Sequence, residues 1–108
     1  MEDAVYCLRA EFFKALGSPV RLKLLNALKD GEKNVCELMD AVGMCQSTVS
    51  CHLSVLRTSG VVSDRREGTS VYYRVSDENV HALLSTLDEI LKGQCEEVSK
   101  ALAALLGR

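Results

Sequence analysis

Apolar residues recur every three to four positions along most of the chain, which is the spacing of one face of an α-helix. In residues 4–16 this stripe predicts a first helix that ends at Gly17. Its inward residues are expected to be Val5, Leu8, Phe12 and Leu16.

The next two helices carry start signals. A helix is expected after Ser18 and Pro19, because a serine hydroxyl can cap a backbone N–H and a proline in the first position loses no hydrogen bond. This helix ends near Gly31, and its inward residues are expected to be Leu22, Leu25 and Leu28. Asn34 and Glu37 have the spacing of a capping box, so a short third helix is expected to follow.

The third helix has Leu38 and Val42 inward and is expected to close at Gly43. After a brief turn, residues 46–59 predict a fourth helix, which Gly60 ends. Its inner stripe is Val49, Leu53 and Leu56.

After Gly60 the spacing of apolar residues no longer follows the period of a helix. Residues 61–66 and 70–75 are rich in β-branched and aromatic side chains, and they flank a turn at 67–69, which predicts a two-stranded hairpin. The last third of the chain is again amphipathic, with inward residues expected at Val80, Leu84, Leu87 and Leu91. The stripe is interrupted at Gly93 and resumes at Cys95, so one long helix or two successive helices both fit.

The predicted fold is mainly α-helical with a small β-hairpin wing. Two helices joined by a tight turn, followed by a basic hairpin, make a winged helix-turn-helix. The helix-turn-helix would occupy residues 34–59 and the wing residues 61–75 of a single domain, 1–108. A chain of 108 residues with 47% hydrophobic content is too short for two ordinary domains.

Composition and charge indicate where the protein is located and which partners it can bind. No run of about 18 apolar residues exists and the N-terminus is acidic, so no membrane partner and a cytoplasmic location are expected. Five cysteines, an odd number, fit a reducing compartment. The net charge is −2, but residues 46–75 carry +2 and residues 77–108 carry −3, so the basic excess lies in the segment of the fourth helix and the hairpin, as expected of a surface that faces DNA.

The fourth helix has an outward side rich in small polar residues. At about 100° per residue, these lie opposite the inner stripe and can reach phosphates or base edges, while arginines supply charge. The candidate DNA-binding residues are Gln46, Ser47, Thr48, Ser50, Cys51, Ser54, Arg57, Arg65 and Arg66. The alternative is a solvated polar helix face beside a surface hairpin.

The central segment, residues 14–75, resembles the core of the arsenic- and metal-responsive ArsR/SmtB repressor family. The resemblance is carried by SPVRLKLL at 18–25, QSTVSCHLSVLR at 46–57 and DRREGTSVYYRV at 64–75. It implies a homodimer, joined through its first and last helices in residues 1–16 and 77–108, that binds double-stranded operator DNA and leaves when an inducer binds.

The metal sites of the family are not intact in this sequence. Members that sense arsenite or cadmium carry Cys-Val-Cys at the start of the third helix, where this chain has Asn34, Val35 and Cys36. A further family thiol is Met39 here. Asp77 matches the first ligand of the zinc-sensing members, and His81 is offset from the pattern. The remaining zinc positions hold Asn79, Ile90 and Gly93, so a zinc site of that type is not expected.

Two cysteines are candidates for redox sensing. Cys45 is expected at the N-cap of the fourth helix, where serine would cap better, and Cys51 is expected on its outward side. Oxidation of either thiol, or a disulfide between them that unwinds the helix, would release DNA. Cys51 also fits as a simple contact to a base.

Three other cysteines are candidate metal ligands: Cys7, Cys36 and Cys95. Cys36 is expected in the first helical turn, where a thiolate is favoured, but it also fits as a small half-buried residue. Cys95 also fits as a core or dimer-interface residue.

The sequence therefore predicts a DNA-binding repressor, not an enzyme, that senses its inducer through cysteine thiols and requires no cofactor. An alternative is induction by a thiophilic ion such as arsenite or cadmium. A third hypothesis is a winged-helix module that binds proteins and not DNA.

Overall fold

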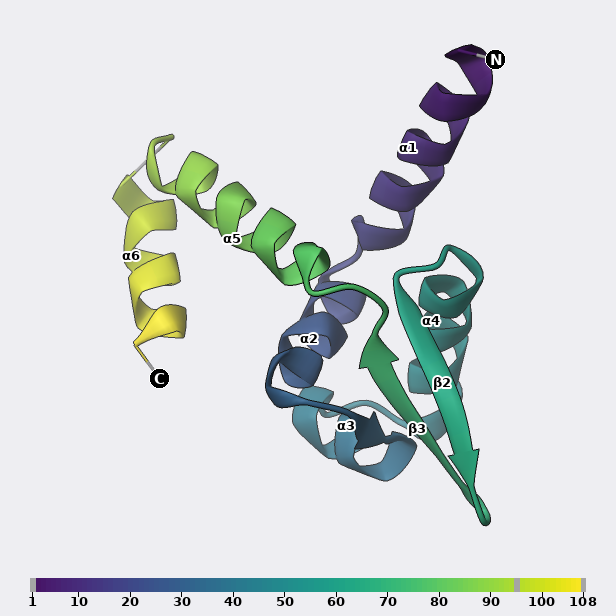
Figure 1. The fold of residues 1–108 in the computed structure, drawn as a ribbon. Helices are drawn as coiled ribbons and strands as arrows, with labels where there is room; N and C mark the ends of the chain where they lie inside the picture. The colour runs from purple at the N-terminus through teal and green to yellow at the C-terminus, as the bar shows by residue number, and fades with distance from the viewer. Residues whose placement is uncertain (1, 95, 108) are drawn as a thin grey trace. The chain divides into compact units, whose positions relative to one another are not determined.

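The computed structural model describes residues 2–94 and 96–107, except for the side chains of Glu96 and Val98. Its backbone contacts divide the chain into two compact units, within residues 1–77 and 78–108. The first unit holds four α-helices and a small sheet, and the second holds two helices (Figure 1). Cys95, one of the three candidate metal ligands, lies outside the described residues.

The four α-helices predicted for the first unit are confirmed, with small shifts at their ends. They are α1 (Glu2–Leu16), α2 (Pro19–Ala27), α3 (Val35–Val42) and α4 (Gln46–Thr58), and a 3₁₀ turn, η1 (Leu28–Asp30), follows α2.

Local hydrogen bonds explain the helix ends. The Ser18 hydroxyl accepts from the backbone N–H of Arg21 at the start of α2. At the start of α3 the capping box is complete: Glu37 N donates to Asn34 Oδ1 at 2.8 Å, and Asn34 N donates to Glu37 Oε1 at 3.0 Å. Gly43 ends α3 with a φ of 67°, a left-handed conformation that favours glycine.

The core of the first unit is formed where α2, α3, α4 and the sheet meet. Its fully buried side chains are Leu24, Leu25, Leu38, Val49, Leu53, Leu56, Val61 and Val62. The expected inner stripe of α4 is confirmed. On α2 the prediction was partly wrong: Leu24 is fully buried and Leu22 is half-buried, because the side of α2 that packs against α3 and α4 carries Leu24.

Helix α1 contributes little to this core. Only Ala15 and Leu16 at its end are buried, whereas Val5 and Leu8 are 46% and 72% exposed. The apolar stripe predicted for this helix therefore exists, but Val5 and Leu8 on it are exposed and not buried.

The sheet has three antiparallel strands in the order β1-β3-β2. The predicted hairpin is confirmed as β2 (Val62–Glu67) and β3 (Ser70–Val75), with β2 starting one residue later than expected. Strand β1 (Lys33–Asn34) was not predicted, because two residues are too short to show a period of two. It pairs with Tyr72 and Tyr73 of β3 and so joins the wing to the start of α3.

The second unit consists of α5 (Asn79–Lys92) and α6 (Glu96–Leu106). The sequence left open whether the last helix is continuous, and the structure has two helices with the first ending at Gly93. Leu87, which was expected to face inward, is 39% exposed. Among the described residues, no helix combines the length and apolarity that crossing a bilayer requires.

Candidate nucleic-acid interface and thiol site

Helix α4 is fixed in rotation by its buried side. Val49, Leu53 and Leu56 are fully buried, so the opposite side of the helix faces outward. The structure places the following candidate residues on this exposed surface: Gln46, Ser47, Ser50, Cys51, Ser54 and Arg57. Thr48 is half-buried at the edge of the same surface.

A side-chain bridge that sequence reasoning missed ties α4 to α2 and to the end of α1. Arg21 on α2 donates from Nε to Nδ1 of His52 on α4 at 3.1 Å. The same guanidinium donates from Nη1 to the backbone oxygens of Lys14 and Ala15 at the end of α1, both at 3.3 Å. No sequence pattern links residues 31 positions apart, so only the fold reveals this bridge.

Cys45 occupies the N-cap of α4, as predicted, but makes no capping hydrogen bond from its side chain. Its Sγ lies 3.3 Å from Ser47 Oγ and 3.3 Å from Thr48 Oγ1. Both hydroxyls can donate to a thiolate at this position, and this lowers the pKa of the Cys45 thiol from 9.0 to about 7. Because Cys45 is also exposed, its thiolate is accessible to reactants in solution.

The remaining cysteines among the described residues make no hydrogen bond through their sulfur, and only Cys51 shares α4 with this site. Cys7, Cys36 and Cys51 are free and exposed, and Cys36 is in the first turn of α3, as expected. The alternative of a half-buried Cys36 is wrong, because the side chain is exposed. Within residues 2–94 and 96–107, no three His, Cys, Asp or Glu side chains are grouped so as to hold a metal ion.

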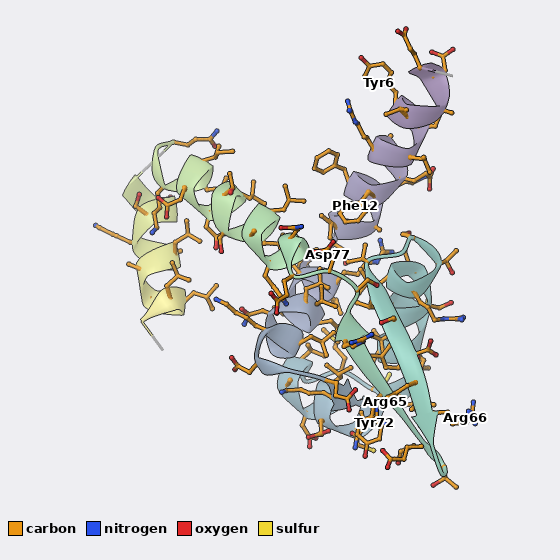
Figure 2. The ribbon with its side chains drawn as sticks, in the orientation of Figure 1. Tyr6, Phe12, Arg65, Arg66, Tyr72 and Asp77 are labelled. Atoms are coloured by element: carbon orange, nitrogen blue, oxygen red, sulfur yellow. The ribbon has the colours of Figure 1, made fainter. Side chains whose placement is uncertain are left out.

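The two wing arginines have different surroundings. Arg65 is paired with Tyr72 in the ladder and Arg66 with Val71, so the two side chains leave opposite faces of β2. Figure 2 shows Arg65 beside Tyr72 and Arg66 pointing away from them. Arg65 forms ion pairs with Glu32 and Glu67, whereas Arg66 forms no hydrogen bond or ion pair within the described part of the chain.

Comparisons with known proteins agree with this architecture. Residues 18–64 match the model of the family described as "Bacterial regulatory protein, arsR family". An uncharacterized HTH-type transcriptional regulator of Methanocaldococcus jannaschii is 39% identical over 82 residues, covering 75% of this chain and 92% of the relative.

Two further matches come from bacteria. A probable mercury resistance operon repressor of Streptomyces lividans is 44% identical over 75 residues, covering 69% of this chain and 60% of the relative. The solution structure of a homodimeric winged helix-turn-helix DNA-binding domain from Mycobacterium bovis, a possible ArsR-family regulator, superposes with a TM-score of 0.77 at 36% identity, covering 86% of this chain and 90% of that one.

The order of elements, the exposed polar side of α4 followed by a wing, and these matches lead to one assignment. The chain belongs to the arsR family of bacterial regulatory proteins and is an ArsR/SmtB-type transcriptional repressor with a winged helix-turn-helix DNA-binding domain, not an enzyme.

Proposed function

We propose that this repressor holds its operator with α4 and the wing, and releases it when the thiol of Cys45 is oxidised or persulfidated. The observation that carries the proposal is the exposed Cys45 thiol at the start of α4, whose pKa is lowered to about 7 by the hydroxyls of Ser47 and Thr48. A thiolate that is available near neutral pH is the reactive form toward hydroperoxides and polysulfides.

The chemistry with a hydroperoxide is balanced within the proposal. The Cys45 thiolate attacks the terminal oxygen, an S–O bond forms as the O–O bond breaks, and the leaving alkoxide or hydroxide takes up a proton. Sulfur is oxidised to a sulfenic acid and the peroxide is reduced. A small thiol can then displace water to give a mixed disulfide. Either product adds a group beside Ser47 and Thr48, where the first turn of α4 meets the DNA.

A disulfide between Cys45 and Cys51 is a less favoured product. Helix α4 is continuous from Gln46 to Thr58, and six residues of helix place the two Cα atoms about 9 Å apart along the axis. This exceeds the separation of about 7 Å that a disulfide can span. A sulfenic acid or a mixed disulfide at Cys45 needs no unwinding.

For the operator contact we propose the outward residues of α4 together with Arg66 of the wing. Hydroxyls in the first turn can donate to phosphates while the helix stays close to the groove. Arg57, near the end of α4, and Arg66, on the wing, add positive charge at exposed positions.

We also propose that the repressor acts as a homodimer, like the Mycobacterium bovis domain. Exposed apolar side chains on α1 and α5 are suited to association with a second copy: Val5, Leu8, Phe13, Leu83, Leu87 and Ile90. Sedimentation equilibrium tests this proposal, and a monomer at micromolar concentration would refute it.

Fluorescence anisotropy of the reduced, metal-free protein on its own upstream DNA tests the thiol proposal. Hydrogen peroxide should release DNA from the wild type and from Cys36→Ser, a matched control in the first turn of another helix. Cys45→Ser should bind DNA and resist peroxide. Release of DNA from Cys45→Ser by peroxide would refute the proposal, and release from a Cys45→Ser, Cys51→Ser double variant would exclude both thiols of this segment.

Induction by a thiophilic ion is the second candidate, favoured by the similarity to the probable mercury resistance operon repressor. The candidate ligands are then Cys7, Cys36 and Cys95. Stoichiometric arsenite or mercuric ion should release DNA from Cys45→Ser if this candidate is correct, and should fail to do so if Cys45 is the sensor. The two candidates are therefore separated by one variant.

A further inference from the structure

The Arg65 side chain contacts three residues, Glu32, Glu67 and Tyr72. These four residues are here called the Arg65 cluster. The Nε of Arg65 donates to both carboxylate oxygens of Glu32, at 3.0 and 2.9 Å, and its Nη2 also donates to Glu32 Oε1. Its Nη1 donates to Glu67 Oε2 at 2.8 Å. The guanidinium carbon lies over the Tyr72 ring, 4.7 Å from the centroid.

The cluster carries net negative charge. Two carboxylates surround one guanidinium, and hydrogen bonding from Arg65 lowers the pKa of the Glu32 carboxyl below its ordinary value of 4.5, so Glu32 stays ionised near neutral pH. All three charges lie well within the Debye length of about 8 Å at physiological salt. A phosphate approaching Arg65 would meet both carboxylates, so this cation contributes little attraction for DNA.

The cluster also spans the sheet. Glu32 directly precedes β1, Tyr72 belongs to the central strand β3, and Arg65 is in β2 on the far side. The ladder pairs Arg65 with Tyr72, and Tyr72 with Asn34, which caps α3. The side chains thus connect the outer wing strand to the start of the helix-turn-helix, on the side where β3 also pairs with the two-residue strand β1.

We propose that Arg65 is a positioning residue and not a DNA contact: the Arg65 cluster sets the wing against the helix-turn-helix so that Arg66, on the opposite face of β2, meets the phosphate backbone. This changes the hypothesis drawn from the sequence, in which both arginines contact DNA. The inference rests on the proposed operator contact by the wing and is independent of the inducer.

The salt dependence of operator affinity tests the inference, because it counts the cations that neutralise phosphates. Arg66→Gln should reduce the slope of log affinity against log salt by about 0.9 for each subunit contact. Arg65→Gln and Glu32→Gln should each weaken binding by about two- to fivefold, the size of a coupled exposed ion pair, with an unchanged slope. The Arg65→Gln, Glu32→Gln double variant should bind the operator no more weakly than either single variant, since the two substitutions break the same ion pair.

Two results would overturn the inference. If Arg65→Gln lowers the slope as much as Arg66→Gln does, Arg65 contacts phosphate. If Glu32→Gln tightens binding and steepens the slope, Glu32 restrains a DNA-contacting Arg65. Unchanged affinity in all three single variants would instead remove the wing from the interface and with it that part of the proposed function. Circular dichroism of each variant controls for folding, and Glu32→Gln tests the linkage even if Arg65→Gln is unstable.

Discussion

The reactivity of Cys45 should depend on pH in a way that separates the folded from the unfolded protein. In the folded protein hydrogen bonds from Ser47 and Thr48 lower the pKa of its thiol to about 7, from the ordinary value of 9.0 that applies to the unfolded chain. At pH 7 about half of the folded thiol is ionised against about 1% of the unfolded one, roughly a fiftyfold excess of thiolate. Alkylation of the folded thiol should therefore be faster at neutral pH.

A more acidic thiol is also a weaker nucleophile, and this limits the effect. With a Brønsted coefficient of 0.4 to 0.5, a drop of two pKa units slows each thiolate by about eightfold. The net advantage of the folded protein is then about sixfold at pH 7, and it reverses to a disadvantage of about sevenfold at pH 10, where both thiols are ionised. The two rates should cross near pH 8, by the same estimate.

Pulsed alkylation with iodoacetamide, followed by mass spectrometry of the Cys45 peptide, measures both rates across pH 5 to 10, with urea-unfolded protein as the reference. Ser47→Ala and Thr48→Ala should each move the folded midpoint upward, because each removes one donor to the sulfur. A folded midpoint that coincides with the unfolded one, or that neither variant moves, would refute the reasoning.

Three further predictions concern stability and are measured by urea unfolding. Asn34→Ala removes the hydrogen bond that Glu37 N donates to Asn34 Oδ1 and should cost about 1 kcal/mol, and an unchanged midpoint would mean that this cap does not stabilise α3. Leu53→Ala empties a fully buried site and should cost about 2–5 kcal/mol, whereas Leu53→Met should cost less than about 1.5 kcal/mol; equal losses would contradict tight packing. Since Gly43 has a φ of 67°, Gly43→Ala should destabilise by about 1 kcal/mol, and a gain in stability would argue against the left-handed cap.

The fold could be predicted from the sequence where local signals and period agree. Ser18 with Pro19, the capping box at Asn34, and Gly43 mark helix ends through chemistry that acts within a few residues. The change of period at Val61 likewise predicted the hairpin. These signals are local, so they survive without knowledge of the tertiary structure.

The details that depend on tertiary contact could not be predicted in the same way. The choice of Leu24 over Leu22 for the core depends on where α3 and α4 pack against α2, and the leucines themselves are indistinguishable in a periodic pattern. Leu87 satisfies the stripe on α5 but is partly exposed, since the stripe shows which side is apolar and not what covers it.

In the candidate site, too, some features follow from local sequence signals and others depend on tertiary contacts. The outward side of α4 follows from its inner stripe, and Cys45 at the N-cap follows from the helix start. That Arg65 and Arg66 leave opposite faces was available from the two-residue period of a strand. The ion pair between Arg65 and Glu32 could not be predicted from the sequence, because 33 positions separate the two residues and only the sheet brings them together.

The two helices of the helix-turn-helix differ at their starts, and the difference bears on the thiol proposal. Helix α3 has a complete capping box at Asn34, whereas α4 begins at a cysteine whose side chain makes no capping hydrogen bond. A serine at position 45 can supply that bond, so Cys45→Ser should stabilise the protein, by up to about 1 kcal/mol. The variant therefore removes the thiol without weakening the helix that carries it. If Cys45→Ser keeps DNA binding and loses its response to peroxide, the loss belongs to the chemistry of the sulfur and not to damage at the interface.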